Sequence, residues 1–543
     1  MAHDSALVLT DSERAIVEAG RGGHVLDLRK PPSHSRRVRA EVLRLLLCSP
    51  ERLGESSPVA LRVRGARITG SLNLGSLSIP CPLSLEDCSF EKPLILSKSE
   101  GSSISLRSSV VPGLRARHLV LTGTMNLAEG FTCIGQANLF GARLARLEAG
   151  RSSFVNGDGK AINANYLSVD GLVSLEHARI DGQIQAIGAS IGGQLDMTDL
   201  RAKSADEYTL EIDSAVVRGG IQLQDAIVDG GIWLVGLTSE GELAFHRAQV
   251  NAPRARAIDA SSTTLGAVDF TDATIRGEVK IAGAQLRVLD CTSATFVDAD
   301  KRSLDLDGST VSGAVHAHFA SITGTLDLTN VSMETYRDTR SSWPPSAALI
   351  GASFRRLEGD EDKIGASAKD VAARLDWIRL DDRFHPQKYA AVATAYRNVG
   401  RESFATEVLM AGRRDSNAGK KGFDAAFSAA LSAIMRVTVG YGFRLRRAVI
   451  WLLGMIAVGA FCLQRASDAE LLRPDESASP TPQLNTLLLA VDLLFPVVSL
   501  GQADAFTPFG WAQYLTAFMS ILGWLLAAIV VAALAGVLQR RQD

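Results

Sequence analysis

The chain has 543 residues, a formal net charge of −2 at pH 7, and 46% hydrophobic against 21% charged residues. This balance excludes a largely disordered protein, and the small net charge excludes the overall basic field through which proteins attract nucleic acid. A chain of this length is too long for one compact core, so we expect three or four units.

The first expected unit, residues 1–58, is a helical cap. The chain does not start with a basic segment followed by a long apolar one, so no secretory signal is predicted. Residues 38–48, VRAEVLRLLLC, carry apolar side chains at helical spacing with arginines between them. A helix here would cover the first strand of the next unit and keep it from pairing with another chain.

Residues 59–335 repeat a nine-residue template: small, x, apolar, x, Gly, x, apolar, x, apolar. Clear copies are ARITGSLNL from Ala66, ARIDGQIQA from Ala178, AIVDGGIWL from Ala226 and ATIRGEVKI from Ala273. Template glycines form pairs eleven residues apart, at 182 and 193, 219 and 230, and 313 and 324. The larger spacing of 36 or 37 residues is near two coils of about 18 residues, a size typical of a solenoid turn.

The predicted fold is therefore mainly β, a parallel β-solenoid. Apolar residues that alternate along a short strand share one face, and stacked coils fill the lumen with them. An antiparallel sandwich also alternates, but its hairpin signals, Asn-Gly or Asp-Gly turns roughly every 8–12 residues, are sparse in this chain.

Residues 336–443 are expected to form a small helical domain beside a membrane. Residues 371–380, 388–399 and 402–410 have helical spacing, and the last two resemble one tetratricopeptide helix pair. From residue 397 to 447, ten basic residues face four acidic ones, a net charge of +6. This basic segment either contacts anionic lipid or is the positively charged flank of a membrane span. The basic residues expected at the membrane surface are Arg436, Arg444, Arg446, Arg447, Arg540 and Arg541.

Residues 444–543 are predicted to be a membrane domain with two uncharged spans, about 448–464 and 514–538. Arginines flank the outer ends of both spans, whereas acidic residues outnumber basic ones in the connecting loop. The positive-inside rule then places both termini and the solenoid in the cytoplasm, at a bacterial inner membrane. The lipid bilayer is thus one expected partner.

A short apolar stretch at about 485–500 lies between the two spans and contains Asp492 and Pro496. Its length suits a re-entrant helix or one that lies in the membrane interface. In the first interpretation, the chain is a two-span channel subunit, and Asp492, Pro496, Ser499, Gly501 and Gln502 lie at or near a pore. In the second, the helix lies on the outer surface and Asp492 faces water.

No pattern in the sequence predicts an active site. The chain lacks a G-x-G-x-x-G run, the G-x-S-x-G at 188–192 is part of the repeat template, and the TVGYG at 438–442 precedes the first span, where no channel filter belongs. His316 and His318 share a strand face without an evident third metal ligand, and none of the six cysteines forms a C-x-x-C pair. We therefore expect no cofactor, no metal, no bound nucleic acid and no catalysis.

The opening VRAEVLRLLL, the glycine-paired coils, the helix pair YRNVGRESFATEVLMAGRR and the two terminal apolar stretches resemble an actinobacterial group of cytoplasmic repeat proteins with a membrane tail. Proteins of that group are described as membrane-associated oxidoreductases, and the coils are also similar to pentapeptide-repeat and bactofilin solenoids. The resemblance implies redox chemistry, which the residues do not support.

Three functions follow from this reading, in order of preference. The first is a membrane-tethered scaffold whose solenoid binds an unknown protein partner or itself. The second, from a different class, is a homo-oligomeric ion channel that the cytoplasmic solenoid gates. The third is the oxidoreductase activity that the resemblance implies.

Overall fold

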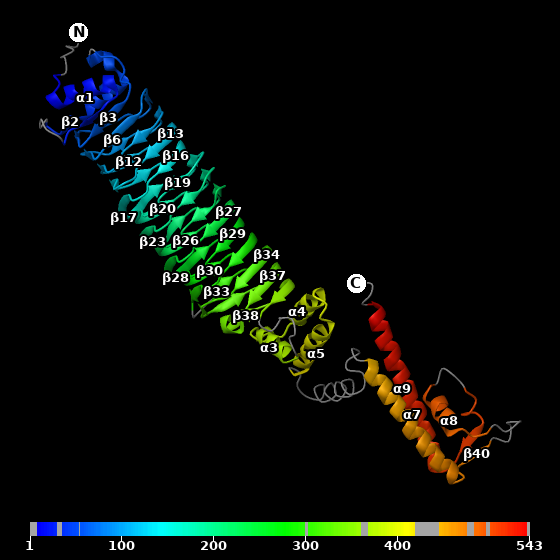
Figure 1. Cartoon of the computed structure of the whole chain (residues 1–543). Coiled ribbons are helices and arrows are strands. Elements are labelled where there is room, and N and C mark those ends of the chain that lie inside the picture. The colour runs from blue at the N-terminus through cyan, green and yellow to red at the C-terminus, as the bar shows by residue number, and fades with distance from the viewer. Residues whose placement is uncertain are drawn as a thin grey trace. The chain divides into compact units, whose positions relative to one another are not determined.

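A computed structural model shows a long parallel β-solenoid, a small helical region and a further helical unit near the C-terminus (Figure 1). It describes residues 8–29, 35–53, 55–298, 302–359, 368–418, 445–474, 483–495 and 500–539. Residue contacts divide the chain into two compact units, Met1–Gly412 and Arg413–Asp543. The predicted mainly β solenoid with a small helical region is confirmed.

The N-terminal end of the solenoid is covered by helices α1 (Asp11–Gly22) and α2 (Ala40–Cys48), followed by the 3-10 helix η1 (Pro50–Leu53). Thr10 and Glu13 form a reciprocal capping box at the start of α1. The carboxylate of Glu13 is buried and also accepts hydrogen bonds from the backbone and side chain of Arg39. This residue therefore fixes α1 to the first strands.

Two parallel sheets form the walls of the solenoid, and successive turns add strands to each. The first sheet contains β1 (Val25–Asp27), β3 (Leu61–Arg64), β5 (Ser78–Ile79), β6 (Leu83–Glu86), β9 (Glu100–Gly101), β10 (Ile104–Ser105), β13 (Val120–Asn126), β16 (Arg143–Glu148), β18 (Ser168–Val169), β19 (Val173–Ser174), β21 (Ser190–Ile191), β22 (Leu195–Asp196), β24 (Val216–Val217), β25 (Ile221–Gln222), β27 (Thr238–Ala244), β29 (Thr264–Asp269), β31 (Gln285–Asp290), β34 (Thr310–Ala317), β37 (Ser332–Asp338) and β39 (Ser353–Glu358). The second sheet contains β2 (Arg37–Arg39), β4 (Arg67–Thr69), β7 (Ser89–Phe90), β8 (Leu94–Ile95), β11 (Val110–Val111), β12 (Leu114–Arg115), β14 (Thr132–Ile134), β15 (Ala137–Asn138), β17 (Ser153–Asn163), β20 (Arg179–Gln185), β23 (Arg201–Glu211), β26 (Ile227–Trp233), β28 (Gln249–Asp259), β30 (Thr274–Lys280), β32 (Thr295–Val297), β33 (Arg302–Asp305), β35 (Ser321–Ile322), β36 (Thr325–Asp327) and β38 (Ser346–Ala348).

The lumen between the sheets is packed with apolar side chains. Alternate strand residues point inward, as in β3, where Leu61 and Val63 are buried and the arginines between and after them are exposed. Near the C-terminal end of the solenoid, Phe245, Phe270, Phe296 and Phe319 stack from turn to turn, with ring centroids 5.1, 5.6 and 5.7 Å apart. This continuous core is what makes strands of two or three residues stable.

The predicted coil of about 18 residues is wrong. Strand register pairs Arg64 with Glu86 and Gln185 with Glu211, at sequence separations of 22 and 26, so both turns are longer than expected. Template glycines eleven residues apart lie on opposite sheets, as Gly182 in β20 and Gly193 beside β22 do. Eleven residues are therefore half of a 22-residue turn. The spacing of 36 or 37 residues between template glycines does not correspond to a whole number of turns.

Longer turns contain a four-residue bulge in the second sheet. The bulges lie in β17, β23 and β28, which are alternate strands of that sheet, and residues 156–159, 204–207 and 252–255 each oppose a single residue of the next strand. The opposing residues are Gly182, Gly230 and Gly277, with φ values of 122°, 111° and 118°. Only glycine adopts such a backbone readily, so three template glycines mark the bulges.

Helices α3 (Ala368–Ile378), α4 (Pro386–Asn398) and α5 (Glu402–Ala418) follow the last turn, after the 3-10 helix η2 (Arg340–Ser342). Helix α4 packs on β39, and the buried Arg374 of α3 forms a two-bonded ion pair with Asp338, at 2.9 Å for each bond. Trp377 packs against Tyr336 and Phe354. These contacts cover the C-terminal end of the solenoid (Figure 1).

The second unit contains α7 (Leu445–Asp468), β40 (Leu472–Pro474), α8 (Thr486–Leu494), β41 (Phe506–Pro508) and α9 (Trp511–Gln539). Its core includes Leu463, Ala490, Leu494 and Met519. Within the part of the chain that the structure describes, no helix is both long and apolar enough to cross a bilayer.

Candidate functional site

Helix α8 lies against both α7 and α9 in the second unit. The antiparallel pairing of β40 with β41 brings together the two ends of the segment that contains α8. A Cβ atom on Gly459 of α7 would collide with the terminal methyl group of Met519 in α9, and one on Gly523 of α9 would lie 2.5 Å from the carbonyl oxygen of Leu494 in α8. Glycine at these two positions thus lets α9 approach α7 and α8.

Asp492 holds the segment after α8 in place. Its side chain is 8% exposed, and its carboxylate accepts backbone hydrogen bonds from Leu500 at 2.8 Å, Gln502 at 2.9 Å and Ala503 at 2.8 Å. The side-chain oxygen of Gln502 in turn accepts the backbone N–H of Asn485 at 3.1 Å. The Asp492 carboxylate, which the sequence analysis expected near a pore, thus accepts hydrogen bonds from backbone N–H groups of a segment without regular secondary structure.

Other residues selected from the sequence are only partly described. Gly501 has a φ of 74°, in the left-handed region, and Gln502 is 8% exposed. Pro496 and Ser499 lie outside the described residues, and so do four of the arginines that the sequence predicts at the membrane surface: Arg436, Arg444, Arg540 and Arg541. Arg446 and Arg447 lie in α7, but their side chains are outside the described part.

On the solenoid, a polar groove of about 730 Å³ lies on the second sheet near its C-terminal end. Its lining comprises Arg256, Glu278, Lys280, Arg302, Asp305, Thr323, Gly324, Thr325, Pro345 and Ser346. Neighbouring turns place Asp259, Lys280, Asp305 and Asp327 in register, one above the next. The three aspartates are buried.

Every carboxylate oxygen of these three aspartates has a partner. One oxygen of each accepts the backbone N–H two residues further on, as in the 3.0 Å bond from Asp307 to Asp305. The other oxygen of each contacts an arginine: Arg256 pairs with Asp259, and Arg302 lies 2.9 Å from Asp305 and 3.2 Å from Asp327. The buried aspartates of the groove are therefore paired with its arginines.

The arginines of this groove are held in their charged form. Burial lowers the pKa of Arg256, but its hydrogen bonds to Glu278 and Asp259 outweigh burial and raise the pKa overall. For Arg302 burial also opposes the charge, and the nearby carboxylates of Asp327 and Asp305 raise the pKa. Sequence reasoning missed this groove because its residues lie one turn apart, as Arg256 and Glu278 do at a sequence separation of 22.

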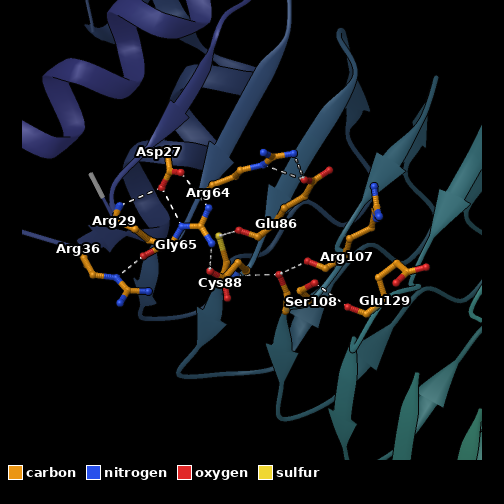
Figure 2. Close-up of polar contacts among 12 residues, drawn as sticks. Asp27, Arg29, Arg36, Arg64, Gly65, Glu86, Cys88, Arg107, Ser108 and Glu129 are labelled. Atoms are coloured by element: carbon orange, nitrogen blue, oxygen red, sulfur yellow. Dashed lines mark hydrogen bonds and ion pairs between the residues drawn. The ribbon is translucent and has the colours of Figure 1, made fainter. Parts of the chain in front are cut away.

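A further polar cluster joins the N-terminal cap to the first turns (Figure 2). Arg29 forms ion pairs with Asp27 and Asp87, both at 2.8 Å, and Arg64 pairs with Glu86 at 2.8 Å. The guanidinium of Arg36 donates to the carbonyl oxygen of Gly65 at 2.6 Å. These contacts connect residues that are far apart in sequence and fasten the cap to the solenoid.

The remaining sequence candidates that the structure describes do not assemble into a reactive site. The rings of His316 and His318 lie 6.4 Å apart, and the described residues contain no group of three side chains suited to a metal ion. All six cysteines are unpaired, and burial raises the pKa of Cys88 and of Cys133 to about 12. Ser190 of the G-x-S-x-G match lies in β21, and the TVGYG match lies outside the described residues.

Comparison with models of protein families, with curated proteins and with solved structures finds no match to this chain. The class of protein that can be stated is therefore the one the fold itself defines, a parallel β-solenoid with helices over both ends.

Proposed function

We propose that the protein is a non-catalytic scaffold, tethered to the bacterial inner membrane by its C-terminal unit, with the solenoid and both termini in the cytoplasm. The observation that carries this proposal is the contrast between a filled lumen and a long, grooved outer face. A repetitive outer surface with helices over both ends suits binding of a protein partner.

Exposed apolar side chains support the membrane tether. Val458 and Phe461 of α7 are 64% and 62% exposed, and Phe518, Ile521 and Trp524 of α9 are 62%, 68% and 64% exposed. Large apolar patches of this kind are unfavourable in water and are typical of surfaces that contact lipid or another protein. Together with the arginines that flank these helices in the sequence, they favour a bilayer as the environment of this unit.

Membrane fractionation of cells that produce the full chain tests the tether. We expect the protein in the membrane pellet, resistant to carbonate extraction and released by detergent. A double Val458→Lys, Ile521→Lys variant should lose membrane recovery because lysine is costly in hydrocarbon. An Arg276→Lys variant, on the outer face of β30, is the matched control and should stay in the pellet. Recovery of the natural chain in the soluble fraction would refute the tether.

A second candidate function is a homo-oligomeric channel. It is favoured by the position at which the C-terminal end of α8 contacts α9, far from the start of α9. Gly523, which contacts the end of α8, lies twelve residues into α9, or about 18 Å at 1.5 Å per residue. This is over half of a hydrocarbon core of about 30 Å. Irregular backbone at that depth is tolerated only inside protein or beside water, as in a pore surrounded by several copies.

Planar-bilayer recording of the purified protein tests the channel. A channel would give a conductance that Asp492→Ala abolishes, since the variant removes the acceptor for three backbone donors of the loop. A silent natural protein contradicts the channel and leaves the scaffold. The oxidoreductase activity implied by the resemblance stays a prediction, which flavin or nicotinamide absorbance in the purified protein would support.

A further inference from the structure

One part of the solenoid lumen is not filled. A cavity of about 40 Å³ lies there, lined by β16, β19, β21 and β22 of the first sheet, by β17 and β20 of the second, and by adjoining turn residues. We propose that this cavity binds a small apolar molecule, of the size of dioxygen or of a xenon atom. The proposal is independent of the scaffold function, which uses the outer face of the solenoid.

Small residues at successive positions of the second sheet leave this space open. The strand register aligns Leu139, Ala164, Ala186 and Ile212, each of which directly follows a strand of that sheet. Backbone hydrogen bonds continue the register through these positions, as from the N–H of Ala164 to the carbonyl oxygen of Gln185. Alanine lacks the branched side chain that the column has in the turns before and after, so two successive turns lack apolar volume.

A third alanine enlarges the gap from the side of the first sheet. Ala149 directly follows β16 and aligns with Leu127 in the turn before and with Leu175 in the turn after. All three residues line the cavity. The alanine at 149 thus removes a large side chain at the level where the second sheet also has alanine.

A position further along the solenoid shows how such an alanine is compensated. Ala260 belongs to the same column as Ala186, three turns further on. The lumen residues that directly follow β27 and β29, just before and just after it, are Phe245 and Phe270, whose rings stack 5.1 Å apart. Ala260 is 1% exposed, whereas Ala186 is 9% and Ala164 is 6% exposed. The additional surface of Ala164 and Ala186 therefore faces the cavity that both residues line.

The chemistry of the lining excludes water and selects an apolar ligand. Every side chain that lines the cavity is apolar. A space needs about 10–15 Å³ to hold a water molecule, but the water also needs about two to four polar partners, which this lining does not supply. Such a cavity stays dry, and an apolar molecule inside it gains dispersion contacts that the lining otherwise lacks. The volume of about 40 Å³ limits the ligand to a few atoms.

Methyl NMR of the detergent-solubilised full chain under xenon pressure tests the proposal. Xenon is the probe because it is apolar, unreactive and small. We expect the methyl signals of Ala149, Ala164 and Ala186 to shift with xenon pressure and to reach a plateau, because a single site saturates. The methyl signal of Ala260, in the same column but without a cavity beside it, is the internal control and should not shift.

Filling the cavity with a larger side chain should compete with xenon. Ala186→Val places a branched side chain at the cavity wall, so we expect the saturable shift of the Ala164 methyl signal to be lost. Ala164→Val fills the same space from the neighbouring turn and should abolish the shift of the Ala186 methyl signal. Ala260→Val is the matched control: it should lower the melting temperature, because that position lacks free space, and leave the xenon shifts intact.

Three results would overturn the proposal: no saturable shift in the natural chain, a shift of the Ala260 signal as large as that of Ala186, or unchanged xenon shifts in both filled variants. Bound water detected next to the methyl groups of Ala164 and Ala186 would also overturn it, because a hydrated cavity does not select an apolar ligand. The measurement on the natural chain needs no variant, so it decides the proposal even when a substitution prevents folding.

Discussion

At the scale of single residues, charged side chains on the solenoid pair mainly across turns. Arg247 pairs with Asp225 at 2.7 Å and Lys203 with Asp181 at 3.0 Å, in each case from one turn to the next. Such exposed pairs contribute about 0–1 kcal/mol each, so they select the register more than they hold the fold together. Buried Glu13 is different, because its carboxylate receives four hydrogen bonds from Arg39 and Thr10.

The state of Glu13 makes the N-terminal cap sensitive to acid. Burial opposes its charge, but the hydrogen bonds from Arg39 and from the backbone outweigh burial and lower the pKa to about 2. A lowered pKa means that the charge stabilises the fold above the ordinary value of 4.5 and ceases to do so as the pH falls toward 2.

We expect Glu13→Gln to lower the unfolding free energy by about 1–3 kcal/mol at pH 7, because it removes the charged acceptor of Arg39. The loss should shrink strongly near pH 2, where about half of the natural carboxyls are also neutral. Urea unfolding followed by circular dichroism at both pH values measures it. Glu18→Gln, exposed on the same helix, is the control. An equal loss at both pH values would contradict the assignment.

The sequence alone predicts which side chains point into the lumen, but side-chain pairs between turns can be predicted only when the turn length is known. Alternating apolar residues identify the inward face directly, and the prediction of a filled lumen follows from them. Pairs such as Arg64 with Glu86 become visible only once the observed strand register is known, because the shorter coil assumed from the template conceals them. The three backbone donors around Asp492 come from a loop whose path no residue pattern specifies.

At the scale of elements, the bulges explain why longer and shorter turns alternate along the middle of the solenoid. Gly230 faces the bulge of β23 with a φ of 111°, and a Cβ atom on it would collide with the side-chain oxygen of Thr209. Four residues can therefore stand opposite one glycine, three more than in a regular ladder, without disturbing the lumen. The sequence displays these glycines, but the template does not separate those that oppose a bulge from the rest.

Gly230→Ala should destabilise the solenoid by about 2–4 kcal/mol, because it combines a backbone strained for any L side chain with a collision. Gly70→Ala is a matched control: Gly70 also has a positive φ, 80°, but a Cβ atom there meets nothing within 4 Å. We expect the control to lose only about 1 kcal/mol. Thermal unfolding measures both, and equal losses would contradict the close approach at the bulge.

At the scale of the whole molecule, helices cover both ends of the solenoid. An uncovered solenoid could pair end to end with other copies and form long assemblies. Edge strands invite pairing with other chains, and the covered last turn avoids it. The cover depends on Arg374 and Asp338, which are both buried. Removing one partner of a buried pair leaves an uncompensated charge.

Asp338→Asn should therefore cost about 3–5 kcal/mol and promote association of the exposed solenoid ends. Asp376→Asn, whose carboxylate pairs with Arg340 at 3.4 Å and is half exposed, is the control and should cost less than about 1 kcal/mol. Chemical unfolding and light scattering measure the two effects. A stable, monodisperse Asp338→Asn protein would refute the role of this pair.

Protease digestion of membrane vesicles tests the central claim most directly, that the C-terminal unit anchors the solenoid to the cytoplasmic face of a membrane. If the claim holds, inside-out vesicles release solenoid fragments to protease, whereas right-side-out spheroplasts protect the solenoid until they are lysed. Fragments released from intact spheroplasts, or vesicles that carry none of the protein, would contradict it.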